Sequence, residues 1–118
     1  MQRMIPVLSA LIFGLASPVA AEFSKVENAA EFKRMIGGKI LTRPLVKLTV
    51  GTDGAIAGKG AAWPISGTWT WKNGYFCRSL EWGGDDLGYN CQEVKASASK
   101  IRFTSDEGRG DSADFSLR

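Results

Sequence analysis

The stretch that decides the fold runs from Gly67 to Val94, GTWTWKNGYFCRSLEWGGDDLGYNCQEV. It contains both cysteines of the chain and three of its four tryptophans. At its centre, Asn73-Gly74 is a strong signal for a two-residue hairpin, because both residues tolerate the positive φ angles of a type I′ turn. The stretch therefore predicts a β-hairpin rich in aromatic side chains.

A two-residue turn at this point also fixes which side chains share a face, since neighbours along a strand alternate between the two sides. Trp71 then lies opposite Phe76, and Trp69 lies opposite Arg78. This face is the candidate ligand-binding face: Trp69, Trp71, Phe76, Arg78 and Trp82. It has two interpretations, which the sequence leaves open. It is either the core of a small β domain, or a barrel mouth or exposed patch that binds an apolar ligand, a glycan or a protein.

Residues 1–21 have the three parts of a secretory signal peptide. Arg3 precedes a short apolar run, Met4 to Ala16, and Val19-Ala20-Ala21 supplies small residues for cleavage after Ala21. The run is shorter than the roughly 20 residues that a membrane-spanning helix needs. We therefore expect a periplasmic or secreted protein with no membrane span after signal cleavage.

Export gives the two cysteines a structural meaning, because an even number of cysteines in an oxidising compartment implies pairing. The one possible pair is Cys77 with Cys91. Closing a loop of this length would stabilise the domain by about 3 kcal/mol. A redox or metal site is the alternative, but the chain has no Cys-x-x-Cys spacing and no histidine.

The remainder of residues 22–118 predicts one helix and several short strands. Asn28 is a suitable N-cap with Glu31 reaching back to it, and Gly37-Gly38 ends the helix at Ile36. Further strands are predicted at 45–50, 89–95, 100–104 and 113–117. A three-residue loop at Thr52-Asp53-Gly54 would place Ile56, Gly58 and Gly60 opposite the first of these strands. The expected fold is mainly β, a small antiparallel up-and-down barrel or curved sheet of about seven strands in a single domain, with the helix on or plugging one end.

The composition excludes several function classes. The chain has 15 Lys and Arg against 12 Asp and Glu, spread along its length, so we expect no nucleic-acid partner. The absence of histidine removes the commonest general base and metal ligand. No phosphate-binding loop or dinucleotide fingerprint is complete, so we expect no catalytic residue, no cofactor and no metal.

The segment Gly83 to Gly88, GGDDLG, is predicted to be a loop. Asp85 and Asp86 within it have two interpretations. Together with Glu81 and Asn90 they could hold a hard cation through oxygen ligands, although the spacing matches no calcium loop. Alternatively, the two aspartates belong to a solvated turn whose geometry favours them.

The block from Gly67 to Val94, together with the C-terminal IRFTSDEGRGDSADFSLR, resembles a group of short exported bacterial proteins that are often labelled dihydrodipicolinate reductase. The resemblance covers most of the chain after the signal peptide. Reductases of that name have a nucleotide-binding Rossmann fold and paired histidines with a lysine, and none of these features is found here, so no catalytic residue carries over. Gly67-Thr68-Trp69 is also similar to the Gly-x-Trp strand of lipocalin- and avidin-like barrels and of small periplasmic inhibitors, which is a likeness of fold.

Three functions follow as hypotheses. The first is a non-catalytic binding module for an unknown small molecule or envelope protein. The second is an inhibitor of an envelope hydrolase, of protease or lysozyme type, that acts through the loop Gly83 to Gly88. The third is an enzyme, including the reductase that the resemblance implies.

Overall fold

The computed structural model describes residues 22–118, which form nine strands and two helices. In chain order they are β1 (Ser24–Lys25), α1 (Ala29–Ile36), β2 (Leu41–Arg43), β3 (Val46–Val50), β4 (Ala55–Gly60), β5 (Trp63–Lys72), β6 (Tyr75–Trp82), β7 (Asp85–Ala96), β8 (Lys100–Thr104), α2 (Ser105–Gly108) and β9 (Ser112–Leu117). The predicted signal peptide, residues 1–21, lies outside the described residues.

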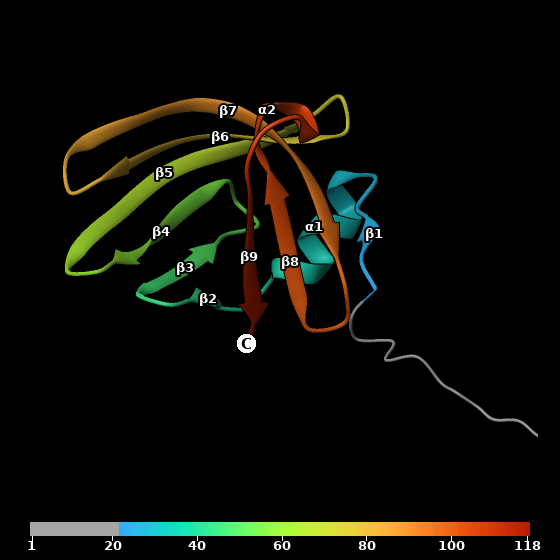
Figure 1. The fold of residues 1–118 in the computed structure, drawn as a ribbon, viewed down its shortest axis with the longest axis horizontal. Helices are drawn as coiled ribbons and strands as arrows, with labels where there is room; N and C mark the ends of the chain where they lie inside the picture. The colour runs from blue at the N-terminus through green and yellow to red at the C-terminus, as the bar shows by residue number, and fades with distance from the viewer. Residues whose placement is uncertain (1–21) are drawn as a thin grey trace, which may run out of the picture.

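The strands form one antiparallel sheet that closes on itself (Figure 1). Its order is β7-β6-β5-β4-β3-β2-β9-β8, and β8 pairs with β7 to complete the barrel. The short β1 adds to the far end of β7. The predicted small β-barrel is therefore confirmed, but the part of the chain described has eight barrel strands rather than about seven. The difference is β2, whose three residues are too few to show an alternating pattern.

The predicted registers of the two central hairpins are confirmed. Trp71 pairs with Phe76 across the Asn73-Gly74 turn, where both turn residues have positive φ angles of 54° and 86°. Val50 pairs with Ile56 across the three-residue loop that ends at Gly54, whose φ is 97°. Both registers place the large apolar side chains inside the barrel.

The segment Gly83 to Gly88 is not the loop that we expected. Only Gly83 and Gly84 form the turn, with φ angles of 57° and 91°, and β7 begins at Asp85. Two consecutive glycines reverse the chain without strain, so the strands continue almost to the tip. The register then shifts beside Leu80 and Glu81, which leaves Leu87 as the extra residue of a bulge.

Helix α1 fills one end of the barrel. Asn28 caps it by accepting a hydrogen bond from the Glu31 amide at 2.9 Å, as predicted. The Glu31 carboxylate instead accepts from the amide of Glu27, one residue before the expected partner. Phe32 and Ile36 face inward and are completely buried. Neither helix in residues 22–118 has the length and apolarity to cross a membrane.

The core lies at this plugged end. The ring of Phe32 packs against Trp69, Phe76 and Phe103, with centroid separations of 5.0, 5.2 and 6.4 Å. The turns β2–β3, β4–β5 and β6–β7 lie at the opposite end, away from α1 (Figure 1). We call this the open end, because the helix does not cover it.

Candidate functional site: a cavity at the open end of the barrel

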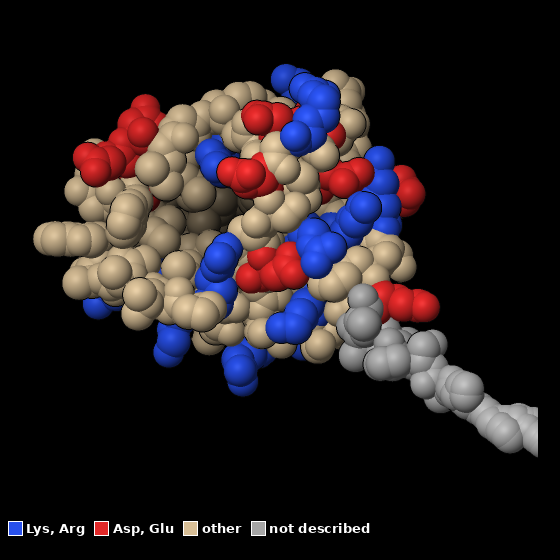
Figure 2. Space-filling view, in the orientation of Figure 1, with Lys and Arg blue, Asp and Glu red and all other residues tan. Residues whose placement is uncertain are grey.

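The inside of the barrel is not filled along its whole length. A cavity of about 310 Å³ remains between the aromatic core and the open end. Figure 2 shows a hollow in this face of the molecule, with acidic and basic side chains at its edge. The residues that line the cavity come from most of the barrel strands and from the β8–β9 connection: Leu41, Leu48, Val50, Ile56, Phe76, Arg78, Leu80, Gln92, Phe103, Ser105, Asp111, Ser112, Ala113 and Phe115.

Most of the cavity wall is apolar. Leu41, Val50 and Ile56 contribute from one side of the barrel, and Phe103 and Phe115 from the other. Each of these five side chains is at least nine-tenths buried. Ligand pockets in proteins typically have volumes of 300–1,000 Å³ and apolar walls with a few polar groups. The cavity is at the small end of that range.

Small side chains leave this space open. The inward positions of β4, β5 and β7 towards the open end include Gly58, Gly67 and Gly88, where the plugged end has Ile56, Trp69 and Val94. At Gly58 and Gly67 the neighbouring strand also comes very close. An added Cβ would overlap the carbonyl oxygen of Lys47 or of Ser79. These two glycines therefore allow the close approach of neighbouring strands and the tight curvature of the barrel.

Arg78 is the basic side chain on the cavity wall. It is half-buried on β6, and its Nη1 donates a hydrogen bond to the carbonyl oxygen of Gly88 at 2.9 Å. The bulge in β7 places this carbonyl opposite Leu80. Burial lowers the pKa of the Arg78 guanidinium below its usual value. An arginine nevertheless stays protonated in proteins, so the cavity contains a fixed positive charge.

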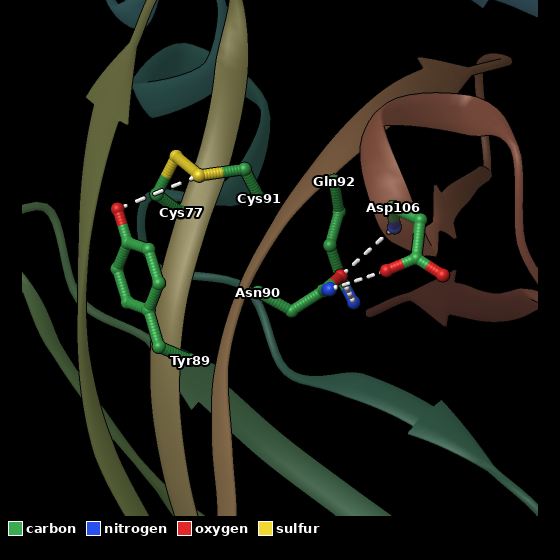
Figure 3. Close-up of a disulfide and its surroundings, with 6 residues drawn as sticks. All are labelled: Cys77, Tyr89, Asn90, Cys91, Gln92 and Asp106. Carbon is green, nitrogen blue, oxygen red and sulfur yellow. Dashed lines mark hydrogen bonds between the residues drawn. A yellow bond between two sulfur atoms is a disulfide. The ribbon is translucent and has the colours of Figure 1, made fainter.

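Gln92, another polar residue of the cavity wall, belongs to a hydrogen-bonded network with Asn90 and Asp106 (Figure 3). Gln92 donates to the Asn90 side-chain oxygen at 3.2 Å, and Asn90 donates to the Asp106 carboxylate at 2.8 Å. The Asp106 backbone amide returns a bond to Asn90 at 3.0 Å. This network holds the β8–β9 connection against β7, where Asp106 and Glu107 have left-handed φ angles of 54° and 57°. The connection contains the short α2.

The disulfide lies on the outer face of the same strands. Cys77 and Cys91 are bonded and are direct partners across β6 and β7, which confirms the predicted pairing. The Tyr89 hydroxyl donates to Cys91 Sγ at 3.4 Å (Figure 3). Because side chains alternate along a strand, the disulfide ties β6 to β7 without entering the cavity.

The predicted ligand-binding face divides between three places. Trp69 and Phe76 are buried at 5% and 4% exposure in the core around Phe32, and Trp71 packs against this core. Arg78 lies on the cavity wall. Trp82 lies at the open end, 39% exposed, and its indole donates to the carbonyl oxygen of Gly60 at 2.9 Å.

Exposed apolar side chains surround the β6–β7 turn. Trp63 is 58% exposed and Leu87 is 49% exposed, close to the partly exposed Trp82. Trp63 also contacts Gly83, where an added Cβ would lie 3.1 Å from the Trp63 side chain. We call this group the tip: Trp63, Trp82 and Leu87. Scattered exposed apolar residues are ordinary, but three of them around one turn form a patch that suits a partner.

The predicted acidic pair, Asp85 and Asp86, lies on the exposed start of β7 beside the tip. Asp86 accepts a hydrogen bond from the Gly88 amide at 2.7 Å, which is the turn-like use of an aspartate. Within residues 22–118 no group of three cysteine, aspartate or glutamate side chains is placed to hold a metal ion.

Sequence reasoning did not find most of the cavity wall. Leu41, Gln92, Asp111 and Phe115 come from separate segments, and only the closed barrel brings them together. Trp63 was also missed at the tip. The neighbouring Pro64 was a usable signal, because proline within a sheet is typical of the start of a strand. That signal places Trp63 near the end of the barrel.

Comparisons with known proteins give no relative for this chain. No protein-family model matches it, and neither a curated protein nor a solved structure does so. Function therefore has to be argued from the barrel and its cavity.

Proposed function

We propose that this protein is an exported, non-catalytic binding module that holds a small apolar molecule inside the open end of its barrel. The supporting observation is the cavity of about 310 Å³ with its wall of leucine, valine, isoleucine and phenylalanine side chains. An apolar molecule that enters such a space leaves water, and this is favourable by roughly 25 cal/mol for each Å² of apolar surface buried. At about 30 Å³ per water-sized group, the occupant has about ten non-hydrogen atoms.

Export is part of the proposal. The Cys77–Cys91 disulfide is typical of oxidising compartments, and the N-terminal sequence pattern is that of a secretory signal. A carrier of this kind would work in the periplasm or outside the cell. Mass measurement of the protein recovered from periplasm and medium tests this, because cleavage after Ala21 leaves Glu22 as the first residue.

Octan-1-ol, a neutral probe of about the right size, tests the binding. We expect titration of ¹⁵N-labelled residues 22–118 to shift the amide signals of Val50, Ile56 and Phe115 on the cavity wall. Ala113→Phe, which places a ring in the cavity, abolishes these shifts. Ala57→Phe is the matched control, because Ala57 is exposed on the outside of β4. The proposal fails if octan-1-ol shifts no cavity signals, or if Ala113→Phe binds it unchanged.

The tip supports a second candidate function, inhibition of an envelope hydrolase. Trp82 and Leu87 lie on β6 and β7, which continue to the Gly83-Gly84 turn, and Trp63 lies on the neighbouring β5, so regular strands hold all three residues. Protease inhibitors commonly present a rigid surface of this kind, whose backbone moves little on binding. Assays of a lysozyme and of trypsin test it. We expect inhibition that Leu87→Glu relieves and Leu45→Glu, an exposed change at another turn, does not.

A further inference from the structure

We propose that the molecule held in the cavity ends in a carboxylate, and that Arg78 binds this group. The inference rests on the proposed function, because it names the chemical class of the ligand for the same cavity. A medium-chain fatty acid is the simplest molecule of that class.

Arg78 has no ion-pair partner in the part of the chain that the structure describes. The ion pairs among residues 22–118 join Lys95 to Glu93, Arg102 to Asp114 and Arg109 to Glu107, and none of them includes Arg78. A guanidinium has five N–H donors, and one protein acceptor, the Gly88 carbonyl oxygen, is found for them in this part of the chain. A half-buried charge without a partner is costly, and an anionic ligand would remove that cost.

The side-chain amides near Arg78 have protein partners for part of their hydrogen-bonding capacity. The amides of Gln92 and Asn90 are hydrogen-bonded to each other and to Asp106. Arg78 lines the mainly apolar cavity and keeps donors for which residues 22–118 supply no acceptor, so it offers a ligand more than these amides do. A ligand with an apolar body and one anionic end would match this cavity, because its body would contact the hydrophobic wall and its anion would contact the Arg78 guanidinium.

The charges around the cavity favour a carboxylate over other anions. Asp111 also lines the cavity and is exposed, and it is not within ion-pair distance of Arg78. One arginine with an aspartate nearby suits a singly charged group better than a phosphate dianion, which would be repelled more strongly. The planar guanidinium also matches a carboxylate with two parallel hydrogen bonds.

Sodium octanoate and octan-1-ol, compared by the same amide titration, test the inference. At pH 7 we expect the wild-type protein to bind octanoate roughly ten- to a hundred-fold more tightly than octan-1-ol, the gain of a hydrogen-bonded charge. Arg78→Met, which keeps roughly the length of the side chain, should bind the two probes about equally, because the preference for octanoate depends on the guanidinium. Arg78→Lys should keep part of the preference.

The two proposals fail differently. If octan-1-ol binds but octanoate binds no better, or if Arg78→Met keeps the preference, the carboxylate is wrong and the binding function stands. If neither probe shifts the cavity signals of the wild type, both proposals are wrong. Should Arg78→Met not fold, the wild type at about pH 3.5 replaces it. There octanoic acid is largely neutral, as a carboxyl with a pKa near 4–5 would be, and the preference should disappear.

Discussion

The two ends of this barrel share the same strands but hold different side chains. At the plugged end, Phe32 of α1 packs against the rings of Trp69 and Phe76, and all three side chains are buried. Towards the open end, the cavity wall includes Leu48, Leu80, Ala113 and one arginine, Arg78, around an empty volume. The difference shows how one sheet is stabilised at one end so that the other can remain unfilled.

The largest effect should come from removing the plug. Phe32→Ala leaves a hole among the rings of the core, and we expect a loss of about 3–5 kcal/mol in the free energy of unfolding. Urea unfolding measures it. Leu87→Ala at the exposed tip is the control and should change the stability by less than about 0.5 kcal/mol. If both variants lost the same free energy of unfolding, Phe32 would not be part of the stabilising core at the plugged end.

The disulfide should matter next. Replacing Cys77 and Cys91 together by alanine removes the link between β6 and β7 and should cost about 3 kcal/mol. Because the disulfide lies outside the barrel, octan-1-ol binding by the remaining folded protein should be unchanged. If the folded variant no longer bound octan-1-ol, the disulfide on the outer face would be needed to keep the cavity in its binding shape.

A matched pair of substitutions compares the two ends directly. Ala96 is buried beneath α1 at 6% exposure, and Ala113 lies on the cavity wall. Ala96→Phe should overpack the core and cost about 1–3 kcal/mol. Ala113→Phe should change the stability by less than about 1 kcal/mol, because its ring enters free space. Thermal unfolding of both variants measures this, and similar losses would show that the cavity is not available.

Much of the plugged end could be predicted from the sequence. Asn28 and the Gly37-Gly38 pair mark the helix, and Asn73-Gly74 fixes the register of Trp69 and Phe76. Each of these signals is local, because it depends on the φ angles and hydrogen bonds of a few neighbouring residues. Such signals can be recognised in the sequence even when the tertiary fold is unknown.

The cavity could not be predicted in the same way. Whether the ring of Trp69 lies in the core and Arg78 beside an empty space depends on what stands across the barrel, namely Phe32 and Phe103 in one layer and Ala113 in the next. Those contacts join residues far apart in the chain. The glycine pair at 83–84 misled the prediction too, because it was taken to begin a loop rather than a two-residue turn.

The β8–β9 connection gives a smaller test at the open end. Asn90 holds Asp106 and Glu107 in left-handed conformations through bonds to the Asp106 amide and carboxylate. Asn90→Ala should lower the stability by about 1 kcal/mol, the value of such bonds. Hydrogen exchange should speed up in residues 105–111 and stay unchanged in α1. Faster exchange in both would mean that the two ends are not independent.

The smallest effect should come from the Arg102–Asp114 pair on the outside of β8 and β9. The hydrogen bond from Arg102, with Nε 2.7 Å from the carboxylate, lowers the pKa of Asp114. A carboxyl with a lower pKa in the folded state stabilises the fold above its unfolded pKa, near 3.9, and loses that contribution as the pH falls through its folded value. Both side chains are about a third exposed, so solvent screens the pair. We therefore expect Asp114→Asn to lower the urea midpoint slightly at pH 7, with the difference from wild type shrinking as the pH falls below the unfolded pKa of the carboxyl and through its lower folded value. A difference that persists at low pH would assign the effect to packing rather than to charge.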